Sequence, residues 1–306
     1  MALNRRTSIL ASLALLGKLG QAHGAPADPV AVTVSFSVLG DLVRVVGGER
    51  LRMQLLVGPN QDAHTFEPRA DDAKALLGSR LLVSNGLGFE PWAGRLVHSS
   101  GFKGRHLLAA NGIKTRSMAD EEGQQTTDPH AWQNPLHVTR YVRNIADALS
   151  DLDPTARADY QARAKAYTIE LTALNAWAKD QFATIAPAQR KAIISHDAFG
   201  YLGEQYRIRF SAPVGLSTES QPNARQMAQL IRQIKRENIR ALFIENMSNP
   251  QLIRQLAQET GVQPGPPLFT DALSEPGGPA SDYLSMMRHN IGALASAMRH
   301  NGVTKN

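Results

Sequence analysis

Three histidines and one aspartate stand out as candidate ligand groups. His64, His196 and Asp271 follow predicted strands, and His130 joins them from a loop that opens a helix. Ligands of open parallel sheets bind beyond the carboxyl ends of the strands, so side chains at those ends can share one site. Three imidazoles and one carboxylate form a set of the right size and type for a divalent transition metal ion. Four protein ligands leave a small tetrahedral ion no open position, which favours holding the ion over catalysis.

Each of these residues also has an ordinary alternative role, and their spacing alone does not establish a metal site. A single loop histidine is more often solvated or hydrogen-bonded, and an aspartate after a strand can cap a turn. Trp132 and Phe199, each close to a candidate histidine, are typical core residues that could also wall a site from water. We expect the other histidines on the surface: His98, His106, His137, His289 and His300.

Enzyme signatures are missing from the chain. It contains no HExxH, no GxSxG elbow, no GxGxxG after a strand and no P-loop. Ser195, His196 and Asp197 are adjacent, and adjacent side chains at a strand end point apart, so they do not form a catalytic triad. The sequence therefore favours a binding protein over an enzyme.

Composition sets the broad class. A chain of 306 residues with 42% hydrophobic content can bury one large core or two ordinary ones. The formal net charge is +6, and the basic residues are spread along the chain, which is not the pattern of a nucleic-acid-binding protein. There is no cysteine, so the chain can form no disulfide and any metal site must do without thiolate.

Residues 1–24 have the pattern of a signal peptide. Arg5 and Arg6 precede a mostly apolar run from Ile9 to Leu19, and small residues near Gly24 suit cleavage. The paired arginines leave general and twin-arginine export both open. Because an N-terminal cysteine is missing, we expect a free periplasmic protein with no lipid or direct membrane anchor.

The rest of the chain alternates strands and helices, which predicts mostly parallel sheets flanked by helices. Strands are expected at 30–36, 51–57, 81–84, 106–108, 192–195, 208–214, 241–244 and 267–270. Helices are expected at 37–44, 69–77, 135–149, 227–237, 252–260 and 282–299. The polar segment 114–127 is predicted to be a mobile surface loop.

One long helix divides this pattern. It has Asp153 as N-cap and Pro154 at the first helical position, and it ends at Ala186, before Pro187. One apolar stripe recurs along it at steps of three and four, formed by Tyr160, Ala164, Tyr167, Leu171, Leu174 and Trp177. We expect an α/β fold of two lobes, 27–150 and 188–306, joined by a rigid spine helix at 153–186. The alternative is a long helix packed on one large domain.

Five segments resemble the signatures of the zinc and manganese substrate-binding proteins of bacterial ABC transporters. They are DAHTFEP at 62–68, NGLGFEPW at 85–92, DPHAW at 128–132, SHDAFGY at 195–201 and FTD at 269–271. The resemblance covers nearly the whole chain after residue 24, in the order of the family. It implies two α/β lobes on one rigid helix with a single ion between them, held by His64, His130, His196 and Asp271.

The resemblance also implies a function and partners. A periplasmic carrier of this kind captures a divalent ion and delivers it to a membrane permease with a cytoplasmic ATPase, and we expect it to act as a monomer. Zn²⁺ is the expected ion because His196 occupies a position where manganese or iron carriers often have Glu. Mn²⁺ or Fe²⁺ is the alternative, and the segment 114–127 lacks the histidines of many zinc carriers. A secreted metal-dependent hydrolase and a surface adhesin are the rivals from other classes.

Overall fold

The computed structural model describes residues 28–120, 123–216, 218 and 222–302, and the predicted signal peptide lies outside them. The strands are β1 (Val30–Phe36), β2 (Leu51–Val57), β3 (Leu81–Ser84), β4 (Arg105–Leu108), β5 (Ser117–Ala119), β6 (Gln125–Thr127), β7 (Lys191–Ile193) and β8 (Arg209–Ser211). The helices are α1 (Ser37–Gly47), α2 (Ala70–Leu77), α3 (Ala93–Ser100), α4 (Pro135–Leu152), α5 (Arg157–Ala183), α6 (Gly200–Tyr206), α7 (Ala224–Glu237), α8 (Gln251–Thr260) and α9 (Tyr283–Met298).

The first sheet is parallel throughout, in the order β2-β1-β3-β4. Its central strands β1 and β3 are buried along their whole length, which explains their nearly unbroken apolar sequences. The strands run in one direction, so their carboxyl ends meet at one edge of the sheet. The loop after β2 begins at that edge and carries His64.

A second parallel sheet forms in the C-terminal half. β7 pairs with β8, and single bridges add Leu242 beside Ile193 and Leu268 beside Glu245. The segments expected as strands at 241–244 and 267–270 therefore make parallel contacts, but they pair too briefly to be regular strands. The α/β fold class is confirmed.

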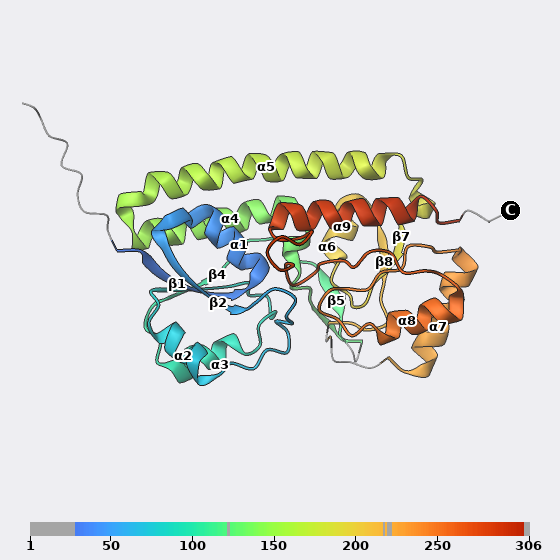
Figure 1. The fold of residues 1–306 in the computed structure, drawn as a ribbon, viewed down its shortest axis with the longest axis horizontal. Helices are drawn as coiled ribbons and strands as arrows, with labels where there is room; N and C mark the ends of the chain where they lie inside the picture. The colour runs from blue at the N-terminus through green and yellow to red at the C-terminus, as the bar shows by residue number, and fades with distance from the viewer. Residues whose placement is uncertain (1–27, 121–122, 217, 219–221, 303–306) are drawn as a thin grey trace, which may run out of the picture.

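Helix α5 spans both sheets. It crosses the top of Figure 1, with α4 and α9 lying beneath it. Five residues of the predicted stripe are buried, and they are Tyr160, Ala164, Tyr167, Leu171 and Leu174. The sixth, Trp177, is half-buried, and Asn175, Ala178 and Phe182 are buried without having been predicted. The helix is 27 residues long and starts later than predicted, because Pro154–Ala156 form a 3-10 turn. Asp153 does not cap α5: its carboxylate accepts hydrogen bonds from Arg50, Thr155 and Tyr160 instead.

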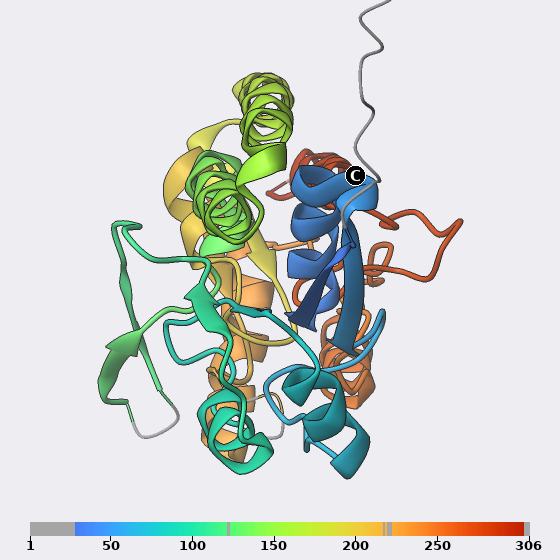
Figure 2. The same cartoon turned by 90° about the vertical axis from the view of Figure 1, so that its left-hand side faces the viewer.

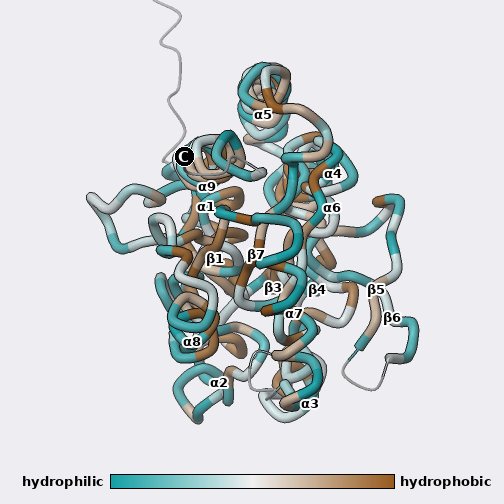
Figure 3. The backbone as a smooth tube through the Cα atoms, turned by 90° about the vertical axis from the view of Figure 1, so that its right-hand side faces the viewer, coloured by the Kyte–Doolittle hydropathy of each residue, from teal (hydrophilic) through white to brown (hydrophobic). Residues whose placement is uncertain are grey.

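The apolar interior is continuous beneath α5. Residues of β1, α4, α5, α6 and α9 belong to one buried cluster, and a smaller cluster lies among β7, α7 and α8. Figure 3 shows hydrophobic residues along β1, β3 and β7 inside the molecule and hydrophilic ones on its outer loops. The division into two lobes, 27–150 and 188–306, joined by a spine helix at 153–186, stays a prediction.

Substitutions on α5 should separate its buried stripe from its solvent face. Leu171 is fully buried, so Leu171→Ala is expected to lower the free energy of unfolding by about 2–5 kcal/mol through lost contacts and a cavity. Ile169 on the same helix is 65% exposed, and Ile169→Ala is expected to change that free energy by no more than about 0.5 kcal/mol. Urea denaturation of the metal-free protein measures both, and equal losses would contradict the assignment of the buried face.

The predicted loop at 114–127 has more structure than expected. β5 and β6 pair as an antiparallel hairpin, with Met118 buried beneath it. The other positions are Ser117 and Ala119 in β5 and three polar residues in β6, and segments this short show no alternating pattern in the sequence. Helices α3 and α6 were also not predicted, because each is shorter than three turns and carries too few apolar residues to show a helical period.

Candidate metal centre

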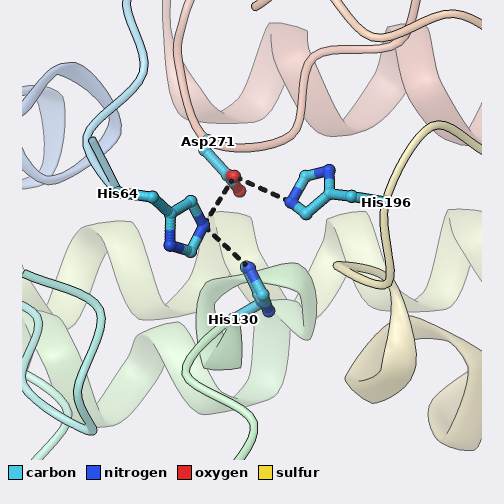
Figure 4. A group of neighbouring side chains, drawn as sticks. All are labelled: His64, His130, His196 and Asp271. Atoms are coloured by element: carbon cyan, nitrogen blue, oxygen red, sulfur yellow. Dashed lines mark hydrogen bonds and ion pairs between the residues drawn. The ribbon is translucent and has the colours of Figure 1, made fainter. Parts of the chain in front are cut away.

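The four predicted residues lie together between the two sheets (Figure 4). One potential ligand atom from each of His64, His130, His196 and Asp271 lies within 4.8 Å of the other three. Asp271 Oδ2 is 3.3 Å from His64 Nε2 and 3.1 Å from His196 Nε2. The Nε2 atoms of His64 and His130 are 3.4 Å apart.

These separations suit a small ion at the middle of the group. Zinc bonds to nitrogen and oxygen ligands are about 2.0–2.1 Å long, which places neighbouring corners of a tetrahedron about 3.3 Å apart. Three of the distances between candidate ligand atoms, 3.1, 3.3 and 3.4 Å, are close to that edge length. The side chains can therefore surround an ion with little rearrangement.

Local hydrogen bonds hold the His64 loop in place. The backbone N–H of His64 donates to Asp62 Oδ1 at 2.8 Å, which folds the loop into an Asx turn. The indole N–H of Trp92 donates to the carbonyl of Ala63 at 2.7 Å. Since Trp92 is buried, this bond fixes the loop to the core of the first sheet.

His130 is oriented by the aspartate two residues before it. Asp128 Oδ1 accepts from the backbone N–H of His130 at 3.0 Å and from its ring Nδ1 at 2.8 Å. With the proton on Nδ1, the lone pair of Nε2 faces the centre. Burial alone would raise the pKa of the Asp128 carboxyl, but the hydrogen bond from His130 and the nearby guanidinium of Arg116 keep that pKa below its usual value.

His196 has an equivalent partner from a distant segment. Its ring Nδ1 lies 2.5 Å from Glu245 Oε2, and Glu245 Oε1 accepts from the backbone N–H groups of Ser195 and His196. Thr270 also donates to Glu245 at 3.2 Å. A carboxylate held this firmly fixes the ring plane and directs Nε2 toward the centre.

Asp271 is positioned by contacts from both halves of the chain. The carbonyl of the preceding Thr270 accepts hydrogen bonds from the indole of Trp132 and the amide of Gln133, each at 2.9 Å. On the other side, the amide of Asn290 in α9 binds the backbone of Phe269. The aspartate therefore stands at the place where the two halves meet.

The centre contains polar atoms that the protein leaves without hydrogen bonds. Both carboxylate oxygens of Asp271 and Nε2 of His196 are buried and make no regular hydrogen bond, and the contact between Asp271 Oδ2 and His196 Nε2 is an ion pair only when His196 is protonated. Burial alone would raise the pKa of the Asp271 carboxyl, but the imidazoles of His196 and His130 keep that pKa below its usual value. Buried unpaired groups are costly, and a cation between them would remove that cost, so the donor set fits a divalent metal.

Burial differs among the four side chains. His130, His196 and Asp271 are fully enclosed, whereas the side chain of His64 is 8% exposed. The aromatic wall is formed by Phe89, whose ring centroid lies 4.6 Å from that of His64, and by Trp132, 5.4 Å from His130. An ion would therefore enter on the His64 side.

The structure corrects several expectations about neighbouring residues. Phe199 is buried and stacks on Phe210, which is the role of a core residue. His137 and His289 are half-buried, contrary to the expectation that they lie on the surface. The sequence analysis assigned no role to Asp128 or Glu245. Glu245 could have been found, because it directly follows a predicted strand, and a position of that kind was the reason for choosing His64, His196 and Asp271.

Comparison with known proteins agrees with this geometry. Residues 32–297 match the family model described as zinc-uptake complex component A, periplasmic. The chain belongs to this family. The family's members are substrate-binding proteins that serve ABC transporters of metal ions, and they work with a membrane permease and an ATPase. Its proteins are carriers and not enzymes.

Individual relatives within the family carry the names of different metals. The manganese-binding lipoprotein MntA of Halalkalibacterium halodurans is 30% identical, over 87% of this chain and 88% of its own length. The manganese ABC transporter lipoprotein PsaA of Streptococcus mitis is 26% identical, over 91% and 92%. Among solved structures, the periplasmic zinc-binding protein TroA of Treponema pallidum superposes with a TM-score of 0.82 at 25% identity, over 89% of this chain and 99% of its own.

These relatives correct the expected localisation. The prediction of a free periplasmic protein without a lipid anchor is wrong in the light of family members that are named lipoproteins, in Halalkalibacterium and in several streptococci. That prediction rested on the absence of one residue type, and such an absence does not show how a chain is held at a membrane. Within the described part of the chain, the helices are all too short or too polar to cross a bilayer.

Proposed function

We propose that this chain captures a single Zn²⁺ ion between its two sheets and passes it to the permease of an ABC importer. His64, His130, His196 and Asp271 would be the ligands, and the protein would act as a monomer. The observation that supports the proposal is the convergence of three imidazole rings on the fully buried carboxylate of Asp271, with His196 Nε2 at 3.1 Å and His64 Nε2 at 3.3 Å from its Oδ2. A divalent cation among these atoms would balance the buried carboxylate and use the lone pairs of the neutral rings.

The charge of the surroundings supports this proposal. Asp128, Glu245 and Asp271 are buried carboxyl groups near the rings, and Arg116 is the guanidinium that reaches Asp128. Carboxylates therefore outnumber the cations that contact them, which favours binding of a divalent ion. Four protein ligands would also fill a tetrahedral shell, leaving no position for the water that a metal hydrolase needs.

Manganese is the alternative cargo, because several relatives are named for it. Manganese favours oxygen ligands and higher coordination, whereas zinc accepts imidazole nitrogen readily in a tetrahedron. Three nitrogens and one carboxylate therefore favour zinc. Zinc also binds more tightly than manganese at almost any site of this kind, so tight zinc binding alone does not identify the cargo. A substitution of one ligand that changes the preference between the two metals is more informative.

Competition titration of the metal-stripped protein tests the proposal. We expect one ion bound per chain, with Zn²⁺ preferred over Mn²⁺, and we expect His196→Glu to narrow that preference by weakening the zinc complex more than the manganese complex. The exposed His98 provides a matched control, since His98→Glu should leave the preference unchanged. A parent protein that holds manganese as tightly as zinc would be a manganese carrier, and one that binds neither would not be a metal carrier.

A further inference from the structure

The β5–β6 hairpin is tied directly to the metal centre at its base. Arg116 comes immediately before β5 and Asp128 immediately after β6, and the N–H of Asp128 donates to the carbonyl of Arg116 at 3.0 Å. The two strands stand away from the body of the protein in Figure 2, where the hairpin is drawn in green at the left. The residue that orients His130 is thus also the residue that closes the hairpin.

The two oxygens of the Asp128 carboxylate have different partners. Oδ1 accepts both hydrogen bonds from His130, while Oδ2 lies 2.5 Å from Arg116 Nη1. Asp128 is fully buried, and the side chain of Arg116 is 24% exposed. Because a carboxylate bound on both oxygens cannot rotate, the guanidinium sets the plane in which Asp128 holds the imidazole.

Arg116 also reaches the other half of the protein through α6. Its Nε donates to Glu204 at 2.9 Å and its backbone N–H donates to the hydroxyl of Tyr201 at 3.2 Å. That hydroxyl donates in turn to the carbonyl of Asp128 at 2.9 Å. Helix α6 begins just after the loop that carries His196. Arg116 therefore links Asp128, which orients His130, to the segment that carries His196.

Gly200, the first residue of α6, shows how closely this contact is packed. A Cβ added there would lie 1.7 Å from Arg116 Nη1 and 2.6 Å from Asp128 Oδ2. Only a residue without a side chain lets the guanidinium lie against the helix and reach Asp128. The glycine is explained by this approach, because its backbone φ does not lie in the left-handed region.

We propose that Arg116 is a positioning residue of the metal centre: by clamping Asp128 against α6, it fixes the ring of His130 and slows release of the bound ion. The inference rests on the proposed function, because it assumes that His130 is a ligand. It also gives the hairpin a role, since any partner that lifts the hairpin off α6 would draw Arg116 away from Asp128 and loosen the centre. A mobile loop without these contacts could not act in this way.

The test compares the rate at which zinc leaves the loaded protein, measured by stopped-flow transfer to an excess of a chromogenic chelator. Partners of metal ligands typically contribute about 10–100-fold to metal affinity, so Arg116→Ala is expected to release zinc about tenfold faster or more. Gly200→Ala removes no side chain but displaces the guanidinium, and the same acceleration is expected. If Arg116→Ala does not fold, Gly200→Ala by itself is sufficient to test the proposal.

Two matched controls separate positioning from general loosening. Gly94 lies near the start of α3 with no atom close to an added Cβ, and Arg105 forms an exposed ion pair with Asp151. Gly94→Ala and Arg105→Ala should release zinc at the parent rate. Because Arg116→Ala and Gly200→Ala remove one and the same contact, the double variant should be no faster than Arg116→Ala.

The outcomes distinguish this inference from the proposed function. The role of Arg116 would be overturned if Arg116→Ala and Gly200→Ala both released zinc at the rate of the parent protein. It would also be overturned if the double variant accelerated release by the product of the two single accelerations. Zinc binding itself would remain intact in either case. A parent protein that binds no zinc would instead remove the proposed function, and the inference with it.

Discussion

Replacing any one of the three histidines with Ala is expected to weaken zinc binding by orders of magnitude. Each of His64, His130 and His196 would supply one of four bonds, and its loss leaves an under-coordinated ion in place of a closed shell. The loss of affinity should be largest for His130 and His196, because carboxylates already hold these two rings in the orientation that binds the ion. Calorimetric titration of metal-stripped variants with Zn²⁺ measures the change.

A control and the stability of the fold make this result specific. His98 is exposed and lies on α3, so His98→Ala should bind zinc like the parent. Among the ligand variants, His64→Ala should disturb the fold least, because this side chain is partly exposed. Zinc affinity at the parent level in all three ligand variants, each folded by circular dichroism, would show that the ion binds elsewhere.

Zinc binding is also expected to weaken steeply as the pH falls from about 7.5 to about 5, because imidazole must be neutral to coordinate and its ordinary pKa is about 6.5. Burial alone would lower the pKa of His196, but the carboxylates of Glu245 and Asp271 raise it well above that value in the metal-free protein. A raised pKa means that a proton already competes with the ion near neutral pH. This competition increases as the pH decreases, so the affinity for zinc falls continuously across the interval.

This pH dependence can be measured by competition with a chelator whose own protonation is known, at constant ionic strength. His196→Glu supplies an informative comparison, since it replaces one imidazole with a carboxylate that is ionised over most of the interval. Its affinity should decline less steeply than that of the parent. An affinity for zinc that stays flat across the interval would contradict a centre built mainly from imidazoles.

Much of the centre could be predicted because its ligands follow elements with strong sequence patterns. β2 and β7 end at recognisable loops, and the general rule for parallel sheets then places His64 and His196 each beyond the carboxyl edge of its own sheet. The stripe on α5 repeats at helical spacing over several turns, so most of its buried face was predicted, although Asn175, Ala178 and Phe182 were not. These features depend on local sequence.

The supports of the ligands could not be predicted in the same way. Glu245 meets His196 across 49 residues of sequence, and nothing local to either residue signals that pairing. Asp128 lies beside His130 in the chain, but its second oxygen binds Arg116 only because the intervening residues form a hairpin. Contacts of this kind are decided by the packing of distant segments.

The wide separation of the ligands along the chain has a consequence for the order of folding. His64 comes from the loop after β2, whereas Asp271 comes shortly before α9, so nearly the whole chain must be in place before the two can meet. Closing so long a loop has an entropic cost that local contacts do not repay, and non-local contacts of this type form late. A chain that has only begun to fold therefore has no assembled centre, so under the proposed function the ion would not nucleate folding and would be acquired by the finished protein.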